Sequence, residues 1–422
     1  MTLNVFKNTV LFFVLAMISC ASKMKTNNHT NDKNASVYLV NKTINVDSTR
    51  ILVGANQTEL YLPLLKGKHV GIVANQTSVI FKNHSSETKK TLYTHLVDSL
   101  LSLNINVRKV FAPEHGFRGT ADAGANVSDG IDKKTKLPLI SLHGKHRKPT
   151  PKALKELDIV VFDIQDVGVR FYTYISTLHN VMEACAEAGI PVIVLDRPNP
   201  NGHYVDGPTL KIENQSFLGM HPIPLVHGLT IGEYAKMING EQWLANGVPC
   251  DIKIIPVKNY THYTPYSLPI RPSPNLPNDQ SIKLYPSLGL FEGTNINAGR
   301  GTEFQFQRYG APFLNNKTMT FKYTPIPNFG AKHPKHKNIL CYGEDLKDVS
   351  VKGMSLKWVI KAYQNTTDTS KFFNTSNFTK HAGTDLLQKQ IMSGLSEAEI
   401  KASWKKELEK FKSTRAKYLM YP

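Results

Sequence analysis

The chain has 422 residues, of which 41% are hydrophobic and 20% charged, so it is long enough for two domains with sizeable cores. Lysine and arginine outnumber aspartate and glutamate by 51 to 33, giving a formal net charge of +18. This excess favours an anionic partner, although a purely solubilising surface charge explains it equally well. The chain lacks zinc-finger spacing, an arginine-rich helix and an aromatic RNA-binding motif, which argues against nucleic acid.

The first twenty residues resemble the export signal of a bacterial lipoprotein. Lys7 precedes an apolar run at 10–18 that is too short to span a bilayer and suits a signal peptide. The run ends at Ile18-Ser19-Cys20, which is similar to a lipobox, so we expect Cys20 to be acylated; a cleaved signal with an incidental cysteine is the alternative. Residues 21–48 are rich in Asn, Lys, Ser and Thr and predict a solvated tether. The expected location is membrane-anchored, either periplasmic or at the cell surface.

From about residue 49, short apolar runs alternate with helical patterns. The runs are continuous and rich in Val and Ile, which is typical of parallel strands buried on both faces. Six strands are predicted, at His69–Asn75, Val107–Ala112, Pro138–Leu142, Ile159–Ile164, Pro191–Leu195 and Ile252–Val257. Four helices are predicted between them, at Thr88–Leu101, Thr150–Glu156, Thr177–Ala188 and Thr230–Gly240. The alternation predicts an α/β fold with a Rossmann-like, doubly wound, mostly parallel sheet.

The composition of the chain and its secondary-structure pattern change near residue 257. Proline and asparagine become frequent and the strand–helix alternation fades. We therefore expect a Rossmann-like catalytic domain at 49–257 and a smaller α+β domain at 258–422 that completes a cleft. The second domain should end in an amphipathic helix that begins at Ser396, where Glu399 supplies a capping box.

Polar side chains follow four of the predicted strands. The carboxyl ends of parallel strands meet at one edge of the sheet, where ligands bind in open α/β folds. The side chains that we expect at this edge are Asn75, Glu114, His115, Asp163, Gln165, Asp166, Arg170, Tyr172, Arg197 and Asn199. Each alone is explained more simply as a turn or cap residue, but together they indicate a binding site.

Glu114 is the leading catalytic candidate at this edge. It lies on a glycine-containing turn beside Phe117, where partial burial would let it act as a general acid. An ordinary ion pair with Arg118 is the alternative. For His115, a hydrogen-bonded loop histidine is a simpler role than proton carrier or metal ligand.

A second cluster lies beyond residue 257. Rigid proline turns followed by glycines suit hydrogen bonding to a polyhydroxyl ligand, although an ordinary interdomain linker has the same composition. The candidate binding residues are Ser273, Asn275, Asn295 and Arg300. Glu292 supplies a possible second carboxylate for glycoside hydrolysis, or it caps a helix or pairs with Arg300.

No motif indicates a cofactor. The P-loop and GxGxxG patterns are absent, and the paired histidines at 143/146 and 333/336 lie in lysine-rich loops without carboxylates. Cys185, Cys250 and Cys341 have scattered spacings and are expected to be buried single thiols.

Ordered motifs run through most of the chain. They are PEHGFRG (113–119), DAGANVSDG (122–130), DIQDVGVRFYTYISTL (163–178), DRPNPNG (196–202), VDGP (205–208), GLTIGEYAKMINGE (228–241), PSPNLPN (272–278) and YPSLGLFEGTNINAGRGT (285–302). Together these motifs resemble the exo-β-N-acetylmuramidases (NamZ-like), a family formerly catalogued as a domain of unknown function (DUF1343). The resemblance covers roughly residues 50 to 422.

The resemblance implies an active site between a Rossmann-like domain and a smaller C-terminal domain. It implies release of terminal N-acetylmuramic acid (MurNAc) from peptidoglycan fragments such as MurNAc-GlcNAc and muropeptides, with the glutamate of the family's EHG motif at Glu114. The lactyl carboxylate of MurNAc would need a cation, for which Arg170, Arg197 and Arg300 are candidates. A non-catalytic glycan-binding lipoprotein and a metal-dependent hydrolase are the alternatives. The sequence leaves the stereochemistry of hydrolysis open.

Overall fold

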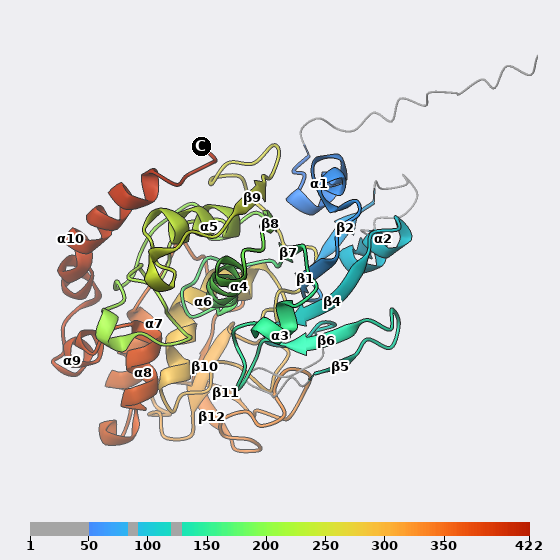
Figure 1. Ribbon diagram of the computed structural model, residues 1–422. Helices are drawn as coiled ribbons and strands as arrows, with labels where there is room; N and C mark the ends of the chain where they lie inside the picture. Colours follow the sequence, from blue (N-terminus) through green and yellow to red (C-terminus); the bar gives the residue numbers. More distant parts are fainter. Residues whose placement is uncertain (1–49, 83–91, 120–128) are drawn as a thin grey trace, which may run out of the picture. The chain divides into compact units, whose positions relative to one another are not determined.

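The computed structural model describes residues 50–82, 92–119 and 129–422, and these belong to one compact unit (Figure 1). The predicted signal, Cys20 and the tether lie outside the described residues, as does most of the segment 122–130. Within the described ranges, no helix is both long and apolar enough to cross a bilayer.

The core of the fold is a seven-stranded sheet in the order β5-β6-β4-β1-β7-β8-β9. The strands are β1 (Val70–Ala74), β4 (Val107–Ala112), β5 (Gly130–Ile131), β6 (Pro138–Ser141), β7 (Ile159–Asp163), β8 (Val192–Leu195) and β9 (Ile252–Ile255). Every neighbouring pair is parallel except β5 with β6. The six parallel strands thus run 3-2-1-4-5-6 in chain order, which confirms the predicted doubly wound, Rossmann-like sheet.

Both faces of this sheet are buried, which explains the continuous apolar runs. Successive residues of β7 alternate between two hydrophobic cores: Val160 and Phe162 belong to one, and Ile159 and Val161 to the other. Helices α4 (Tyr174–Ala188) and α5 (Ile231–Gly240) supply the first core, and α1 (Thr58–Leu65) and α2 (Leu96–Ser102) supply the second. A strand covered by helices on both sides needs apolar side chains at every position.

The helix starts agree with the predicted capping boxes. Thr230 with Glu233 begins α5, and Ser396 with Glu399 begins α10 (Glu397–Ala416). The predicted helix Thr88–Leu101 is wrong over part of its length, since Tyr93–His95 forms β3 and pairs with β2 (Val79–Phe81). Helix α2 begins only after His95, whose ring nitrogen accepts a hydrogen bond from the backbone amide of Val97.

The C-terminal part is the smaller α+β portion of the fold. It contains a three-stranded antiparallel sheet in the order β10-β12-β11, with β10 at Arg308–Ala311, β11 at Phe321–Tyr323 and β12 at Cys341–Asp345. Helices α6 (Asp279–Leu288), α7 (Lys357–Gln364), α8 (Thr375–Ala382) and α9 (Leu386–Met392) and the 3-10 helix η4 (Gly289–Gly293) accompany it. The domain boundary at residue 257 stays a prediction. Cys185, Cys250 and Cys341 are buried free thiols, as expected.

Candidate active site

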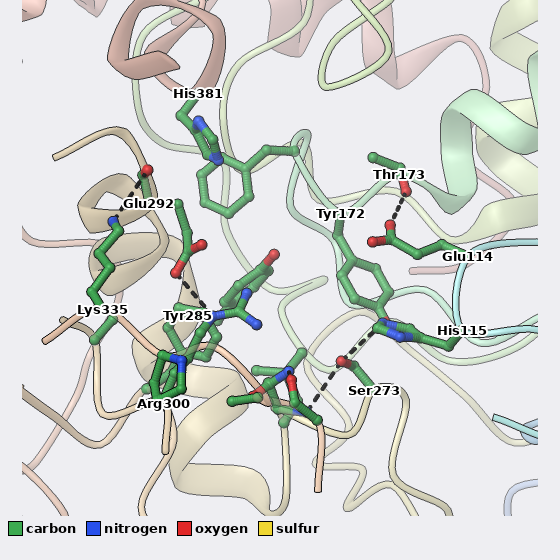
Figure 2. Close-up of a pocket in the computed structure, with 18 of the residues that line it drawn as sticks. Glu114, His115, Tyr172, Thr173, Ser273, Tyr285, Glu292, Arg300, Lys335 and His381 are labelled. Atoms are coloured by element: carbon green, nitrogen blue, oxygen red, sulfur yellow. Dashed lines mark hydrogen bonds and ion pairs between the residues drawn. The ribbon is translucent and has the colours of Figure 1, made fainter. Parts of the chain in front are cut away.

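A cavity of about 660 Å³ lies between the loops at the carboxyl edge of the large sheet and the C-terminal part. This volume is in the range of small-molecule sites. Predicted site residues from both parts line it together: Glu114, His115, Tyr172, Ser273, Asn275, Glu292 and Arg300. Figure 2 shows Glu114 and Glu292 on opposite sides of this cavity.

Glu114 is positioned by the turn after β4 and by the start of α4. The amide of Gly116 donates to the carbonyl of Pro113 over 2.9 Å, and His115 and Gly116 both have positive φ, 68° and 76°. The hydroxyl of Thr173, the residue before α4, donates to Glu114 Oε2 over 3.1 Å. This hydroxyl makes no cap bond to α4 and instead orients the carboxyl group.

His115 connects this turn to the proline-rich segment. Its Nε2 lies 3.2 Å from the hydroxyl of Ser273, which also accepts from the backbone amide of Asn275. The expectation of a hydrogen-bonded loop histidine is confirmed. In a second link, the hydroxyl of Tyr172 donates to the carbonyl of Pro272 over 2.6 Å. The loop after β7 and the segment after residue 271 therefore form one wall.

The opposite wall carries Glu292 in an ion pair with Arg300. Arg300 Nε lies 3.0 Å from Glu292 Oε1, so the predicted pairing is confirmed. Burial opposes ionisation of Glu292, but the charges of Arg300 and Lys335 outweigh burial and hold its pKa below the usual glutamate range. Glu292 is therefore a carboxylate at neutral pH.

Aromatic rings line the space between these two walls. Tyr172 makes edge contacts with Tyr174 and Tyr285 at centroid distances of 4.8 and 5.9 Å. Burial raises the pKa of all three phenols, so they stay neutral and able to donate hydrogen bonds. Such a surface combines apolar faces for a sugar ring with hydroxyl groups for its substituents.

The side-chain amide of Asn275 is held in one orientation at the cavity wall. Its Nδ2 donates to the carbonyl of Gly330 over 2.8 Å, which fixes the amide orientation, because a carbonyl can only accept. Its Oδ1 is buried and has no hydrogen-bond partner within the described part of the chain.

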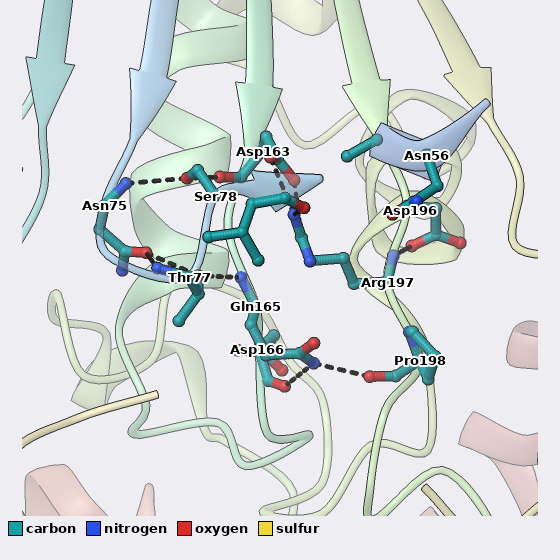
Figure 3. Close-up of polar contacts among 12 residues, drawn as sticks. Asn56, Asn75, Thr77, Ser78, Asp163, Gln165, Asp166, Asp196, Arg197 and Pro198 are labelled. Carbon is teal, nitrogen blue, oxygen red and sulfur yellow. Dashed lines mark hydrogen bonds and ion pairs between the residues drawn. The ribbon is translucent and has the colours of Figure 1, made fainter. Parts of the chain in front are cut away.

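Eight predicted site residues do not line the cavity: Asn75, Asp163, Gln165, Asp166, Arg170, Arg197, Asn199 and Asn295. At the switch point of the sheet the polar groups bind one another instead of facing a ligand (Figure 3). Arg197 makes a two-pronged ion pair with Asp163, with Nε–Oδ1 at 2.6 Å and Nη2–Oδ2 at 2.9 Å, and both side chains are buried. Asp163 and Arg197 therefore hold the strand ends together.

The other buried polar residues at this edge fix loop backbones. Asn75 accepts from Thr77, Gln165 donates to the carbonyl of Pro198, and Asn199 donates to the carbonyl of Leu229. Asp166 accepts from the amide of Gly168, and burial raises its pKa to about 7. Asn295 lies outside the cavity and donates to the carbonyl of Lys371.

Arg170 has a structural role in place of the predicted substrate contact. Its fully buried guanidinium donates to the carbonyls of Pro208, Ile223, His381 and Ala382 at 2.6–3.1 Å. Burial lowers its pKa to about 9, which leaves it charged at neutral pH. It thereby ties the loop after β7 to the carboxyl end of α8, where the partial negative charge of a helix favours a cation.

Sequence reasoning missed several residues that line the cavity, among them Phe171, Thr173, Tyr174, Phe306, Lys335 and His381. Thr173 and Tyr174 directly follow Tyr172 within the motif at 163–178, so their place in that motif was the signal that could have found them. Lys335 and His381 lie in segments without a recognisable motif, and only the fold brings them to the cavity. Across the described ranges, no group of three His, Cys, Asp or Glu side chains is placed to hold a metal ion.

The loops of a Rossmann-like sheet meet a smaller α+β part at this cavity. Two facing carboxyl groups and several aromatic rings line it, and this arrangement suits a glycoside hydrolase. Comparison with known families agrees with this class. The family model described as exo-beta-N-acetylmuramidase NamZ, N-terminal, matches residues 70–280, and the corresponding C-terminal model matches residues 283–421. The chain belongs to the exo-β-N-acetylmuramidase NamZ family.

Individual relatives are similar over nearly the whole chain. The peptidoglycan beta-N-acetylmuramidase NamZ of Bacillus subtilis (strain 168) is 41% identical over 384 residues, covering 86% of this chain and 89% of that protein. A crystal structure of a DUF1343 family protein from Bacteroides fragilis NCTC 9343 has a TM-score of 0.79 and 45% identity, covering 88% of this chain and 99% of that one. A second from the same organism has a TM-score of 0.74 and 29% identity, covering 89% and 100%.

The role of Arg170 leads to a stability prediction. Replacing Arg170 by Met leaves its carbonyl partners without a donor, and we expect the free energy of unfolding to fall by about 3–5 kcal/mol. Equilibrium urea unfolding followed by circular dichroism measures this. The control is Arg108→Met, at an exposed position on β4. A loss for Arg170→Met no larger than that of the control would contradict the structural role.

Proposed function

We propose that this protein is an exo-acting glycoside hydrolase that releases terminal N-acetylmuramic acid from peptidoglycan fragments. The proposal rests on one observation above all, the two carboxyl groups of Glu114 and Glu292 facing each other across a cavity in a chain of the NamZ family. The name of the Bacillus subtilis relative, 41% identical to this chain, supports the same substrate.

The two carboxyl groups have different surroundings, which suits different roles in hydrolysis. We assign Glu114 as the general acid, since the Thr173 hydroxyl orients its carboxyl group at the cavity wall. It would donate a proton to the glycosidic oxygen as the bond to the leaving sugar breaks. Glu292 stays ionised beside Arg300 and is suited to stabilising positive charge that develops at the sugar ring or to activating water.

The product tests the activity directly. Purified protein incubated with the disaccharide MurNAc-GlcNAc should release free MurNAc and GlcNAc, seen by mass spectrometry, because an exo-acting enzyme cleaves at the terminal residue. Full-length glycan strands should yield only the monosaccharide from the non-reducing end. Tight binding of the disaccharide without release of MurNAc would contradict the proposal and favour a glycan-binding protein.

The role of Glu114 is tested by its isosteric amide. We expect Glu114→Gln to lower kcat on the disaccharide MurNAc-GlcNAc by about 10²–10⁴-fold, because the sugar leaving group needs a proton and glutamine keeps the shape but cannot donate one. Glu213→Gln, at an exposed position outside the cavity lining, serves as the matched control. Turnover by Glu114→Gln close to that of the control would remove Glu114 from the mechanism.

We also propose that the protein is exported and held at a membrane by a lipid on Cys20. The support comes from sequence alone: an apolar run at 10–18 followed by Ser19-Cys20, and a polar tether after it. Cys20→Ala should abolish metabolic labelling with radioactive palmitate and move the protein from the membrane fraction to the soluble fraction. Equal labelling of the variant and the natural chain would contradict acylation at Cys20.

A further inference from the structure

One end of the cavity carries basic side chains that proton donation by Glu114 does not use. Arg300 and Lys335 both line this end, and the carboxylate of Glu292 lies near both. His381 also lines it, and burial lowers the pKa of its ring, so it is neutral at neutral pH. Among these four side chains, two cations share one carboxylate, which leaves a net positive charge toward the cavity.

Lys335 supports the wall and has little left to offer a ligand. Its ammonium donates to the carbonyls of Thr294 and Phe291 at 2.6 and 2.8 Å, with those of Glu292 and Ile296 at 3.4 Å. These carbonyls lie at and just beyond the carboxyl end of η4, where a cation is favoured. Lys335 therefore contributes charge to the cavity while its N–H groups bind backbone.

Arg300 has donors to spare. Only its Nε makes a hydrogen bond within the described ranges, to Glu292, so the terminal nitrogens Nη1 and Nη2 remain available. The side chain is 21% exposed, and its guanidinium carbon lies 5.2 Å from the centre of the Phe306 ring. In Figure 2, Arg300 lies beside Tyr285. Glu292 is on one side of Arg300, and His115 and Ser273 are on the other.

The loop that carries Arg300 is held in a strained conformation. Phe306 has a φ of 52°, rare for a bulky residue, and its amide donates to the carbonyl of Ala298 over 2.8 Å. Gly299 and Gly301 on either side of Arg300 also have positive φ, 76° and 78°. Glycine adopts positive φ without strain, so the strain is confined to Phe306. This tight loop places Arg300 at the cavity, where its Nε bonds Glu292.

We propose that Arg300 binds the lactyl carboxylate of a terminal MurNAc residue and so selects this sugar over N-acetylglucosamine. The inference rests on the proposed function. The two sugars differ only in the 3-O-lactyl group, whose carboxylate is ionised at neutral pH. A planar guanidinium already fixed through Nε can give a carboxylate two parallel hydrogen bonds from its terminal nitrogens.

The experiment compares two substrates that differ in charge and hardly in shape. These are 4-nitrophenyl N-acetyl-β-muraminide and its lactyl primary amide. The natural chain should prefer the carboxylate. Arg300→Gln should lower kcat/KM on the carboxylate by at least ~100-fold more than on the amide, and Arg300→Lys, which keeps charge without the planar fork, should lie between. A decrease in kcat/KM that is the same for both substrates measures the loss of the ion pair between Arg300 and Glu292.

A matched control removes another positive charge from the same cavity. Lys332 lines the cavity and is exposed, so Lys332→Gln tests whether any positive charge in the cavity favours an anionic substrate. If Arg300 makes the specific contact, Lys332→Gln should change kcat/KM on the carboxylate and on the amide by the same factor. A carboxylate-to-amide ratio unchanged in Arg300→Gln, or one that collapses in Lys332→Gln instead, would overturn the inference. Circular dichroism and thermal unfolding verify that each variant is folded.

Failure of the proposed function gives a different pattern. If the natural chain hydrolyses neither substrate, the assignment as a hydrolase falls, but Arg300 can still be tested by binding. Calorimetric titration with free MurNAc and its lactyl amide should then show the same preference for the carboxylate, lost in Arg300→Gln. Equal affinities for the two sugars would overturn the inference on its own.

Discussion

The buried guanidinium of Arg170 is the contact on which the cavity depends. It joins the carbonyls of Pro208 and Ile223 in the Rossmann-like part to that of Ala382 at the end of α8. No carboxylate pairs with it in the described ranges, so backbone dipoles alone compensate a fully desolvated charge. The residues that directly follow Arg170 line one wall of the cavity, and His381 lines another. One side chain therefore links segments that lead into both walls.

A second constraint decides where the cavity lies. In open α/β sheets the ligand normally sits at the switch point, here between the carboxyl ends of β1 and β7. In this chain the buried Asp163–Arg197 pair and the amides around it fill that position. The open space is displaced outward, between the turn that carries Glu114 and the loops of the C-terminal part. The fold thus places its chemistry at a junction where one carboxyl group comes from each part.

Sequence patterns predicted what depends on local or repeating interactions. The Val- and Ile-rich runs gave all six parallel strands within two residues, since burial on both faces leaves a continuous pattern. The same reasoning reached Glu114, Ser273, Asn275 and Arg300, which all line the cavity. The sequence did not distinguish these cavity residues from Arg170 and Arg197, which have structural roles. A charged residue after a strand gives the same sequence pattern whether it binds a ligand or an internal partner. The partners of Arg170 at His381 and Ala382 are 211 and 212 residues away, and no pattern in the chain indicates them.

We infer that one cavity holds the terminal sugar with its scissile bond at Glu114 and its acidic substituent at Arg300. A crystal structure of the Glu114→Gln variant with MurNAc-GlcNAc would show both contacts at once. We expect density for the MurNAc ring against Tyr172 and Tyr285. The glycosidic oxygen should lie within hydrogen-bond distance of residue 114, and the lactyl carboxylate should lie on the terminal nitrogens of Arg300. Disaccharide bound elsewhere on the molecule, or in the cavity with its glycosidic oxygen turned away from residue 114, would contradict it.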